Sequence, residues 1–220
     1  MDRVYRKQRY FYDLTRKYYL LGRDRLIRDL APKSGARVVE IGCGTARNLI
    51  AMARRYPGTR LFGLDASSEM LKSAERAIAK ADLGGRITLA HGYAEELTPF
   101  LFGETAPFDH AVFSYSLSMI PDWRRALAQA MAALTQDGRL HIVDFGDLTG
   151  LGRTLRGALL GWLRLFHVAP RTELLGALEQ GAGKNSLRIL PGRYAFILTA
   201  RREDLPAFTA APPSDRGNLS

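Results

Sequence analysis

The chain has 220 residues, of which 46% are hydrophobic and 25% charged, a composition that suits one globular α/β domain with a substantial core. No stretch approaches the ~20 apolar residues of a membrane-spanning helix, and the N-terminus lacks the apolar segment of a secretory signal, so we expect a cytoplasmic protein. The single cysteine, Cys43, excludes an internal disulfide and a cysteine-cluster metal site, and we expect no metal.

The net charge of +10 is concentrated in two segments. Residues 1–37 carry 11 Lys/Arg against 4 Asp/Glu and residues 153–193 carry 7 against 2, whereas residues 38–152 carry 11 against 13. Basic flanks of this kind are typical of proteins that bind an anionic lipid surface or a nucleic acid, although surface charge also serves solubility. Since no nucleic-acid-binding motif accompanies the charge, we expect no nucleic acid partner.

In chain order, residues 8–30 predict one or two helices, interrupted at Gly22 and rich in aromatic residues. Strands and helices then alternate, which predicts a doubly wound, mostly parallel α/β sheet. The predicted strands are 38–41, 60–64, 87–90, 111–114 and 140–143, and the predicted helices are 46–56, 67–81 and 122–134.

Two further predicted strands, 187–190 and 194–199, are separated by Pro191-Gly192-Arg193, a spacing that favours an antiparallel hairpin. We therefore expect seven strands in all, within a cofactor-binding domain over residues 37–205. Residues 1–36 would form an N-terminal helical lid, and residues 206–220 a disordered tail with little apolar material.

The turn after the first strand contains Gly42 and Gly44, which can adopt positive φ and let the backbone approach a ligand. Asp65 ends the second strand, and its carboxylate can accept hydrogen bonds from both ribose hydroxyls of an adenosine. Arg47 stands where a dinucleotide-binding loop has its third glycine, and Glu40 places a negative charge beside the loop. These two residues favour S-adenosylmethionine over a dinucleotide.

The segments VVEIGCGTARNL, LFGLDASSEML, HGYAEEL and FDHAVFSYSL resemble, in order and spacing, the successive motifs of class I S-adenosylmethionine-dependent methyltransferases. The resemblance covers residues 37 to about 199. It implies a Rossmann-like fold and S-adenosyl-L-methionine as cofactor, released as S-adenosyl-L-homocysteine. The implied cofactor-binding residues are Glu40, Gly42, Cys43 and Gly44 for the methionine part, Asp65 for the ribose, Ala66, Met70, Tyr93, Ala94 and Glu95 around the adenine, and Ser114.

Within this set, Cys43 is expected to pack and not to catalyse. Tyr93 departs from the family pattern, because many relatives have an acidic residue at its position. The resemblance therefore implies that Tyr93 stacks on the adenine or that Glu95 replaces the acidic residue.

Two other segments, YFYDLTRKYYLLGRDRLI at 10–27 and FHVAPRTELL at 166–175, resemble the N-methyltransferase of bacterial betaine-lipid synthesis. That enzyme converts diacylglyceryl homoserine to diacylglyceryl trimethylhomoserine by three successive methyl transfers. The resemblance implies a lipid acceptor, peripheral association with the inner membrane, and the enzyme that makes the lipid precursor as a candidate partner.

Two alternatives remain open. Methyltransferases for quinones and other small acceptors share the same core, and a basic nucleic-acid- or membrane-binding module with an ancillary cofactor fold belongs to a different class.

An amine acceptor is protonated at neutral pH, so a group must take its proton before a methyl group can be transferred to it. The candidates are Tyr18, Tyr19, Tyr115 and His141; we expect His141 to be structural, since it begins a predicted strand, and Asp144 to lie nearer the ligand. For the acceptor itself, the candidates are Tyr12, whose ring face attracts a quaternary cation, and Arg23 and Arg171, whose guanidinium groups match its carboxylate.

Residues 153–166, RTLRGALLGWLRLF, combine arginines with leucine, tryptophan and phenylalanine. That combination is typical of a helix that lies at a membrane surface, and the plainer interpretation is a surface helix that covers the active site. Gly157 and Gly161 lower its intrinsic helicity, as suits a mobile cover or a helix ordered by contact.

Overall fold

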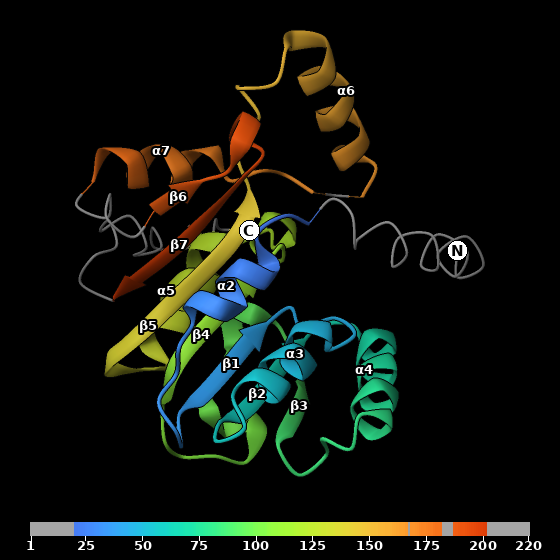
Figure 1. The fold of residues 1–220 in the computed structure, drawn as a ribbon, viewed down its shortest axis with the longest axis vertical. Helices are drawn as coiled ribbons and strands as arrows, with labels where there is room; N and C mark the ends of the chain where they lie inside the picture. The colour runs from blue at the N-terminus through green and yellow to red at the C-terminus, as the bar shows by residue number, and fades with distance from the viewer. Residues whose placement is uncertain (1–19, 167, 182–186, 202–220) are drawn as a thin grey trace, which may run out of the picture.

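The computed structural model describes residues 20–166, 168–181 and 187–201, which form one seven-stranded sheet flanked by helices (Figure 1). The strand order is β3-β2-β1-β4-β5-β7-β6. The strands are β1 (Arg37–Ile41), β2 (Arg60–Asp65), β3 (Ile87–His91), β4 (Phe108–Ser114), β5 (Leu134–Phe145), β6 (Leu187–Ile189) and β7 (Ala195–Arg201). The first five are parallel, and β7 is antiparallel to both β5 and β6. The predicted fold class, including the antiparallel hairpin, is confirmed.

The helices follow the strands in the expected alternation. They are α2 (Arg23–Asp29), α3 (Arg47–Arg55), α4 (Ser68–Lys80), α5 (Trp123–Ala132), α6 (Arg153–Arg164) and α7 (Thr172–Gln180). Short 3-10 helices lie in the connections: η1 (Ala94–Glu96), η2 (Pro99–Phe102), η3 (Leu117–Met119) and η5 (Pro191–Arg193). None of the helices within the described ranges is long and apolar enough to span a bilayer.

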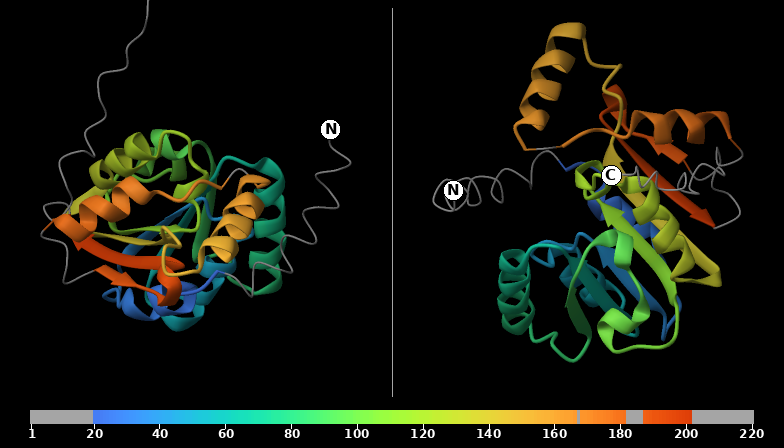
Figure 2. Two further views of the ribbon diagram at one scale, coloured as in Figure 1. Left: turned by 90° about the horizontal axis from the view of Figure 1, so that it is seen from above. Right: turned by 180° about the vertical axis from the view of Figure 1, so that it is seen from behind.

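Each face of the sheet carries its own buried core, because successive side chains of a strand point to opposite faces. In β1, Val38 belongs to the core under α2, α3 and α4, and Val39 to the core under α5 and α7; both side chains are fully buried. Seen from above and from behind, α5 and α2 lie on opposite faces of the sheet (Figure 2). Burial on both faces explains why the central parallel strands are continuous apolar runs.

Two elements differ from the sequence prediction. β5 begins at Leu134, which pairs with Phe108 before an irregularity in the register. The prediction assigned Leu134 to the preceding helix because its apolar spacing fits a helix. His141 therefore lies in the middle of β5 and not at its start. The helix α7 was not predicted, although Leu174, Leu175 and Leu178 are buried in the core beneath α5 and α7.

The expected N-terminal lid is described only from residue 20 onward. In that part, Leu26 and Ile27 of α2 are buried in the same core as α3. Residues 20–36 thus pack as part of the domain, while residues 1–19 and the expected tail lie outside the described residues. The predictions for Tyr12, Tyr18 and Tyr19 fall there as well.

Candidate functional site

The five parallel strands end at one edge of the sheet, and the chain reverses direction across the sheet between β1 and β4. The strands β2 and β3 lie on one side of β1, and β4 and β5 on the other. In an open α/β sheet, ligands bind beyond the carboxyl ends of the strands at this switch point. The loops that meet there follow Ile41, Asp65, His91, Ser114 and Phe145.

The turn after β1 is packed directly against the loop after β4. Gly42 has a φ of 73°, and a Cβ built on it would lie 2.5 Å from the Ser116 Cβ. The Ser116 hydroxyl donates a hydrogen bond to the Ile41 carbonyl at 2.6 Å. Only glycine fits this position, so the backbone of the turn is held open at the edge where a ligand would approach.

Asp65 connects the ends of β1 and β2. The Gly44 N–H donates to its Oδ2 at 2.7 Å, and the Ser67 N–H donates to its Oδ1 at 2.9 Å. Each carboxylate oxygen has two lone pairs, so both oxygens retain acceptor capacity. The arrangement leaves room for hydrogen bonds from the two hydroxyls of a ribose, and that predicted contact stays a prediction.

Glu40 lies on the α3 side of the sheet and is 1% exposed. The Asn48 side-chain amide donates to its Oε1 at 2.7 Å, which directs the carboxylate toward the start of α3. Ser114 is also buried, and its Oγ has no hydrogen-bond partner among the residues that the structure describes. Because it is two residues beyond Val112, which pairs with Glu40, Ser114 faces the same side of the sheet. A buried hydroxyl with unused hydrogen-bonding capacity at this edge is available to a bound ligand.

Cys43, between the two glycines, and Arg47, the first residue of α3, have structural roles. Burial, followed by the charges of Glu40 and Asp65, raises the pKa of the Cys43 thiol, so it stays protonated and packs in the core. Arg47 donates to Asp24 at 2.7 Å and so links α3 to the N-terminal helix. Its side chain is committed to that contact, consistent with a loop that does not bind a pyrophosphate.

The residues expected around an adenine gather at the ends of β2 and β3. His91, paired with Asp65 in the sheet, lies 3.0 Å through Nε2 from the Ala66 carbonyl oxygen. The Met70 N–H donates to the Ser67 hydroxyl at 3.3 Å, and Ser67 thereby caps the start of α4. Tyr93 is 62% exposed at the same edge. Next to it, Ala94 is buried and Glu95 half-buried. His91 was missed, because a polar residue that ends a strand carries no signal of its own.

Asp144 and Arg171 clamp the loop after β4 from two sides. The buried Asp144 accepts hydrogen bonds from the Ser118 N–H at 2.9 Å and the Phe145 N–H at 2.7 Å. Burial raises its pKa to about 6 against the lowering effect of these hydrogen bonds. The sequence predicted that Asp144 lies near the ligand. Its hydrogen bond from the Ser118 N–H also orients η3.

The Arg171 guanidinium is occupied by backbone carbonyls. It donates to Leu117 at 3.1 Å, Ile120 at 2.5 Å and Ser118 at 3.4 Å. These contacts position the β4–α5 loop, and the predicted contact of Arg171 with an acceptor carboxylate stays a prediction.

Tyr115 is the one predicted proton acceptor among the tyrosines for which the structure describes a position. Its φ is 56°, and its hydroxyl donates to the Leu21 carbonyl at 2.7 Å. Burial and the charge of Asp144 raise its pKa, while the nearby Arg23 lowers it. A protonated phenol that donates to a backbone carbonyl is poorly suited to accept a proton, so the geometry favours a role in joining residues 20–22 to the site. Arg23 lies beside it, and its predicted carboxylate contact stays a prediction.

His141 is structural, as expected. Its Nε2 lies 2.9 Å from His110 Nδ1, and its Nδ1 lies 3.2 Å from the Thr199 hydroxyl. Burial lowers the pKa of His141 to about 3. The His141 ring is therefore neutral at physiological pH. Burial lowers the pKa of His110 as well, and the two rings link β4, β5 and β7 inside the sheet.

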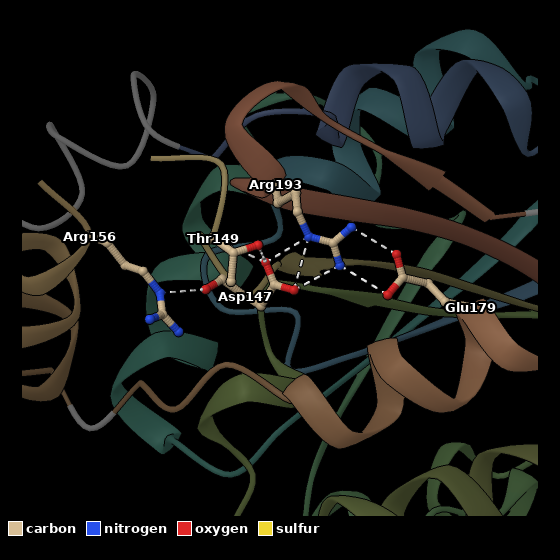
Figure 3. Close-up of polar contacts among 5 residues, drawn as sticks. All are labelled: Asp147, Thr149, Arg156, Glu179 and Arg193. Carbon is tan, nitrogen blue, oxygen red and sulfur yellow. Dashed lines mark hydrogen bonds and ion pairs between the residues drawn. The ribbon is translucent and has the colours of Figure 1, made fainter. Parts of the chain in front are cut away.

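A half-buried ion-pair network joins the elements that follow β5 (Figure 3). Arg193 donates to Asp147 at 2.7 to 2.9 Å and to Glu179 at 2.8 and 3.0 Å. The Arg156 Nε of α6 donates to the Asp147 carbonyl at 3.0 Å. The arginine holds the pKa of Asp147 well below its usual range. Sequence reasoning treated Arg193 only as a turn residue, since its partners are distant in the chain.

Comparison with known proteins supports the same interpretation of the core. The family described as "Methyltransferase domain" matches residues 38–138, which include the glycine turn and Asp65. The ubiquinone/menaquinone biosynthesis C-methyltransferase of Syntrophotalea carbinolica is 28% identical over 197 residues, covering 84% of this chain and 77% of that protein. The demethylmenaquinone methyltransferase of Geobacillus kaustophilus is 30% identical over 207 residues, covering 88% and 82%. For that of Listeria monocytogenes, at 29% identity, the match covers 69% of this chain and 58% of the relative.

Solved structures share the fold at lower identity. The mitomycin 7-O-methyltransferase aligns with a TM-score of 0.61 at 24% identity, over 83% of this chain and 54% of that one. The YcgJ protein of Bacillus subtilis aligns with a TM-score of 0.58 at 21% identity, over 76% and 68%. These likenesses support the sheet topology described above.

Proposed function

The chain belongs to the class I S-adenosylmethionine-dependent methyltransferases, and we propose that it transfers a methyl group from this cofactor to a lipid-soluble acceptor. The observation that carries the proposal is Asp65, oriented by the Gly44 and Ser67 N–H groups beside the turn at Gly42. When bound, the cofactor supplies an electrophilic methyl group for an in-line displacement.

The residues present fit this cofactor. Asp65 would accept the ribose hydroxyls, the backbone at Gly42 and Gly44 would lie against the methionine part, and Glu40 would orient its ammonium group. Tyr93 would cover the adenine. The remaining task of the protein is positioning, which can lower the barrier of such a transfer by as much as ~7–11 kcal/mol when the reacting atoms are held close and aligned.

We propose a demethylated quinone as the first acceptor to test. The relatives quoted above are named as quinone-pathway C-methyltransferases, and the similarity to the protein from G. kaustophilus extends over 88% of the chain. It thus reaches beyond the cofactor-binding half into α6 and α7, which lie toward the carboxyl edge of the sheet (Figure 1). A likeness in that part bears on the acceptor as well as on the cofactor.

A second candidate acceptor is the amine of diacylglyceryl homoserine, and a specific observation favours it. The described parts of the two segments that resemble the betaine-lipid enzyme, residues 20–27 and 168–175, contact the loop after β4. Leu21 accepts the Tyr115 hydroxyl, and Arg171 holds the carbonyls of η3. Segments that frame this loop are suitably placed to influence which acceptor binds.

The test is transfer of a labelled methyl group from S-adenosylmethionine to each acceptor, dispersed in detergent, by the purified protein. Labelled menaquinone supports the first acceptor and labelled diacylglyceryl trimethylhomoserine the second. If neither acceptor is labelled by protein that binds the cofactor, both acceptor assignments are wrong and the family assignment stands.

The variants for this assay are Asp65→Ala and, as a matched control, Asp109→Ala. Asp109 accepts the Arg37 N–H at 2.8 Å at the opposite edge of the sheet, so its loss also removes a carboxylate-to-backbone hydrogen bond. Asp65→Ala should abolish cofactor binding and transfer, and Asp109→Ala should retain both. Equal loss in the two variants would mean that Asp65 acts only through stability.

A further inference from the structure

The helix α6 stands beyond the carboxyl edge of the sheet and presents much of its surface to solvent (Figures 1 and 2). Leu163 is its one fully buried residue within the described chain, at 1% exposure, and belongs to the same core as Tyr115. Leu159, Leu160 and Trp162 are half-buried and pack against the same core, so this side anchors α6 beside the proposed site, while Leu155, Ala158 and Leu165 are exposed.

An apolar stripe runs along that outer surface. We define it as Leu155, Ala158, Trp162 and Leu165, which are spaced by three, four and three residues and so lie on one side of the helix. Leu155 is 60% exposed and Leu165 75% exposed. Trp162 is half-buried between them, its ring 5.0 Å from that of Phe166. Single exposed leucines are ordinary, but a continuous stripe with an aromatic centre marks an interaction surface.

Positive charge lies on a second exposed side of α6, about 100–180° around the helix from the residues of the stripe. Arg153 and Arg164 are exposed, and neither has an ion-pair partner within the part of the chain that the structure describes. No aspartate or glutamate occurs from residue 148 to residue 172. A partner that covers the stripe must therefore combine apolar surface with negative charge, a combination that an anionic bilayer supplies at the boundary between head groups and acyl chains.

The helix is also held in place before any partner binds. Arg156 in its first turn donates to the Asp147 carbonyl, and Asp147 is fixed by the ion pair with Arg193 (Figure 3). Two further exposed apolar residues, Leu21 and Met119, at 46% and 41%, belong to segments at this same edge of the sheet. Exposed apolar side chains thus occur at this edge outside α6 as well.

We propose that α6 docks on an anionic bilayer surface, with the stripe at the acyl boundary and Arg153 and Arg164 on the lipid head groups. The docking places the carboxyl edge of the sheet against the membrane. This docking deepens the proposed function, because a lipid-soluble acceptor would enter from that side. The docking itself rests on α6 alone and does not depend on which acceptor is methylated.

The test is binding of the full chain to vesicles of phosphatidylcholine with and without phosphatidylglycerol, at low and high salt. The expected result is sedimentation with the anionic vesicles, weakened by salt. The variant Leu155→Ser/Leu165→Ser should reduce the partition coefficient at least about tenfold. Arg153→Gln/Arg164→Gln should remove most of the salt dependence.

Phe100→Ser is the matched control, because Phe100 is 72% exposed in η2 and does not belong to the stripe. It should bind vesicles like the unmodified chain. In a Trp123→Phe background, the fluorescence of Trp162 should shift to shorter wavelength on vesicles, which reports contact of the stripe itself. Methyl transfer to a detergent-dispersed acceptor should be unchanged in the leucine variant, so failure of docking and failure of the catalytic proposal are distinguishable.

Three results would overturn the proposal. They are unchanged vesicle binding by the leucine variant, absence of binding to anionic vesicles, and a dimer in solution that the leucine variant dissociates. The last result would identify a second copy of the chain as the occupant of the stripe.

Discussion

Replacing Gly42 with alanine should destabilise the fold and weaken cofactor binding together. The residue has a φ of 73°, and the new Cβ would lie 2.5 Å from the Ser116 Cβ. The left-handed backbone costs an alanine roughly 1–2 kcal/mol. The overlap of the new Cβ with the Ser116 Cβ, in a packed loop, adds about 1–3 kcal/mol to this cost. Together they predict a loss of about 2–5 kcal/mol in the free energy of unfolding.

Gly35 provides a matched control for the backbone part of this loss. Its φ is 82°, and a Cβ built on it would meet nothing within 4 Å. Gly35→Ala should therefore cost only the roughly 1–2 kcal/mol of the left-handed conformation. The effect of alanine on the unfolded chain is common to both variants and cancels in their difference. The difference, about 1–3 kcal/mol, isolates the contact between the turn and Ser116.

Urea denaturation of the two variants measures this difference, and calorimetric titration with S-adenosylmethionine measures cofactor affinity. Gly42→Ala should lose affinity at least about tenfold, whereas Gly35→Ala should bind like the unmodified chain. Equal destabilisation by the two substitutions would refute the steric argument. Normal cofactor binding by folded Gly42→Ala would refute the assignment of the turn to the cofactor.

Three other variants probe positions around the site. Burial lowers the pKa of His141 to about 3. Below about pH 6.5 the ring therefore binds a proton in the unfolded chain but not in the folded chain. The contribution of His141 to stability is complete above pH 6.5 and is lost as the pH falls. The stability advantage of the unmodified chain over His141→Gln should shrink by about 2 kcal/mol between pH 7 and pH 5, and a constant difference in denaturation curves would contradict the neutral buried ring. Asp144, whose raised pKa of about 6 acts with the opposite sign, is common to both proteins and cancels. Arg171→Lys should lower kcat about tenfold or more at unchanged cofactor affinity, because the single nitrogen of an ammonium cannot reach carbonyls that Nε and Nη2 of the guanidinium contact separately. A change confined to cofactor affinity would argue against positioning. Arg193→Lys should lose about 1–3 kcal/mol in urea denaturation, since the ammonium cannot bridge both carboxylates bidentately, and an unchanged midpoint would mean that the ion pair contributes nothing.

Much of the architecture could be read from local patterns in the chain. The apolar runs at β1 and β4 predicted strands buried on both faces, and their alternation with amphipathic helices predicted the parallel sheet. Gly42 and Asp65 were identifiable because a strand end, a positive-φ glycine and a carboxylate at the next strand end are all short-range signals. Strand and helix periodicity and turn chemistry depend on neighbours within a few residues, so sequence alone determined them.

The contacts that shape the site depend on tertiary structure. Ser116 confines Gly42 from the loop after β4, which is distant in sequence, and Arg171 reaches the same loop from the residue before α7. The Arg193 ion pair joins three segments that are separate in the chain (Figure 3). An arginine or serine has the same local preferences whether it faces solvent, an acceptor or a backbone carbonyl. Only the packing of the sheet edge decided which partner each one meets, because burial there leaves polar groups no water to bind.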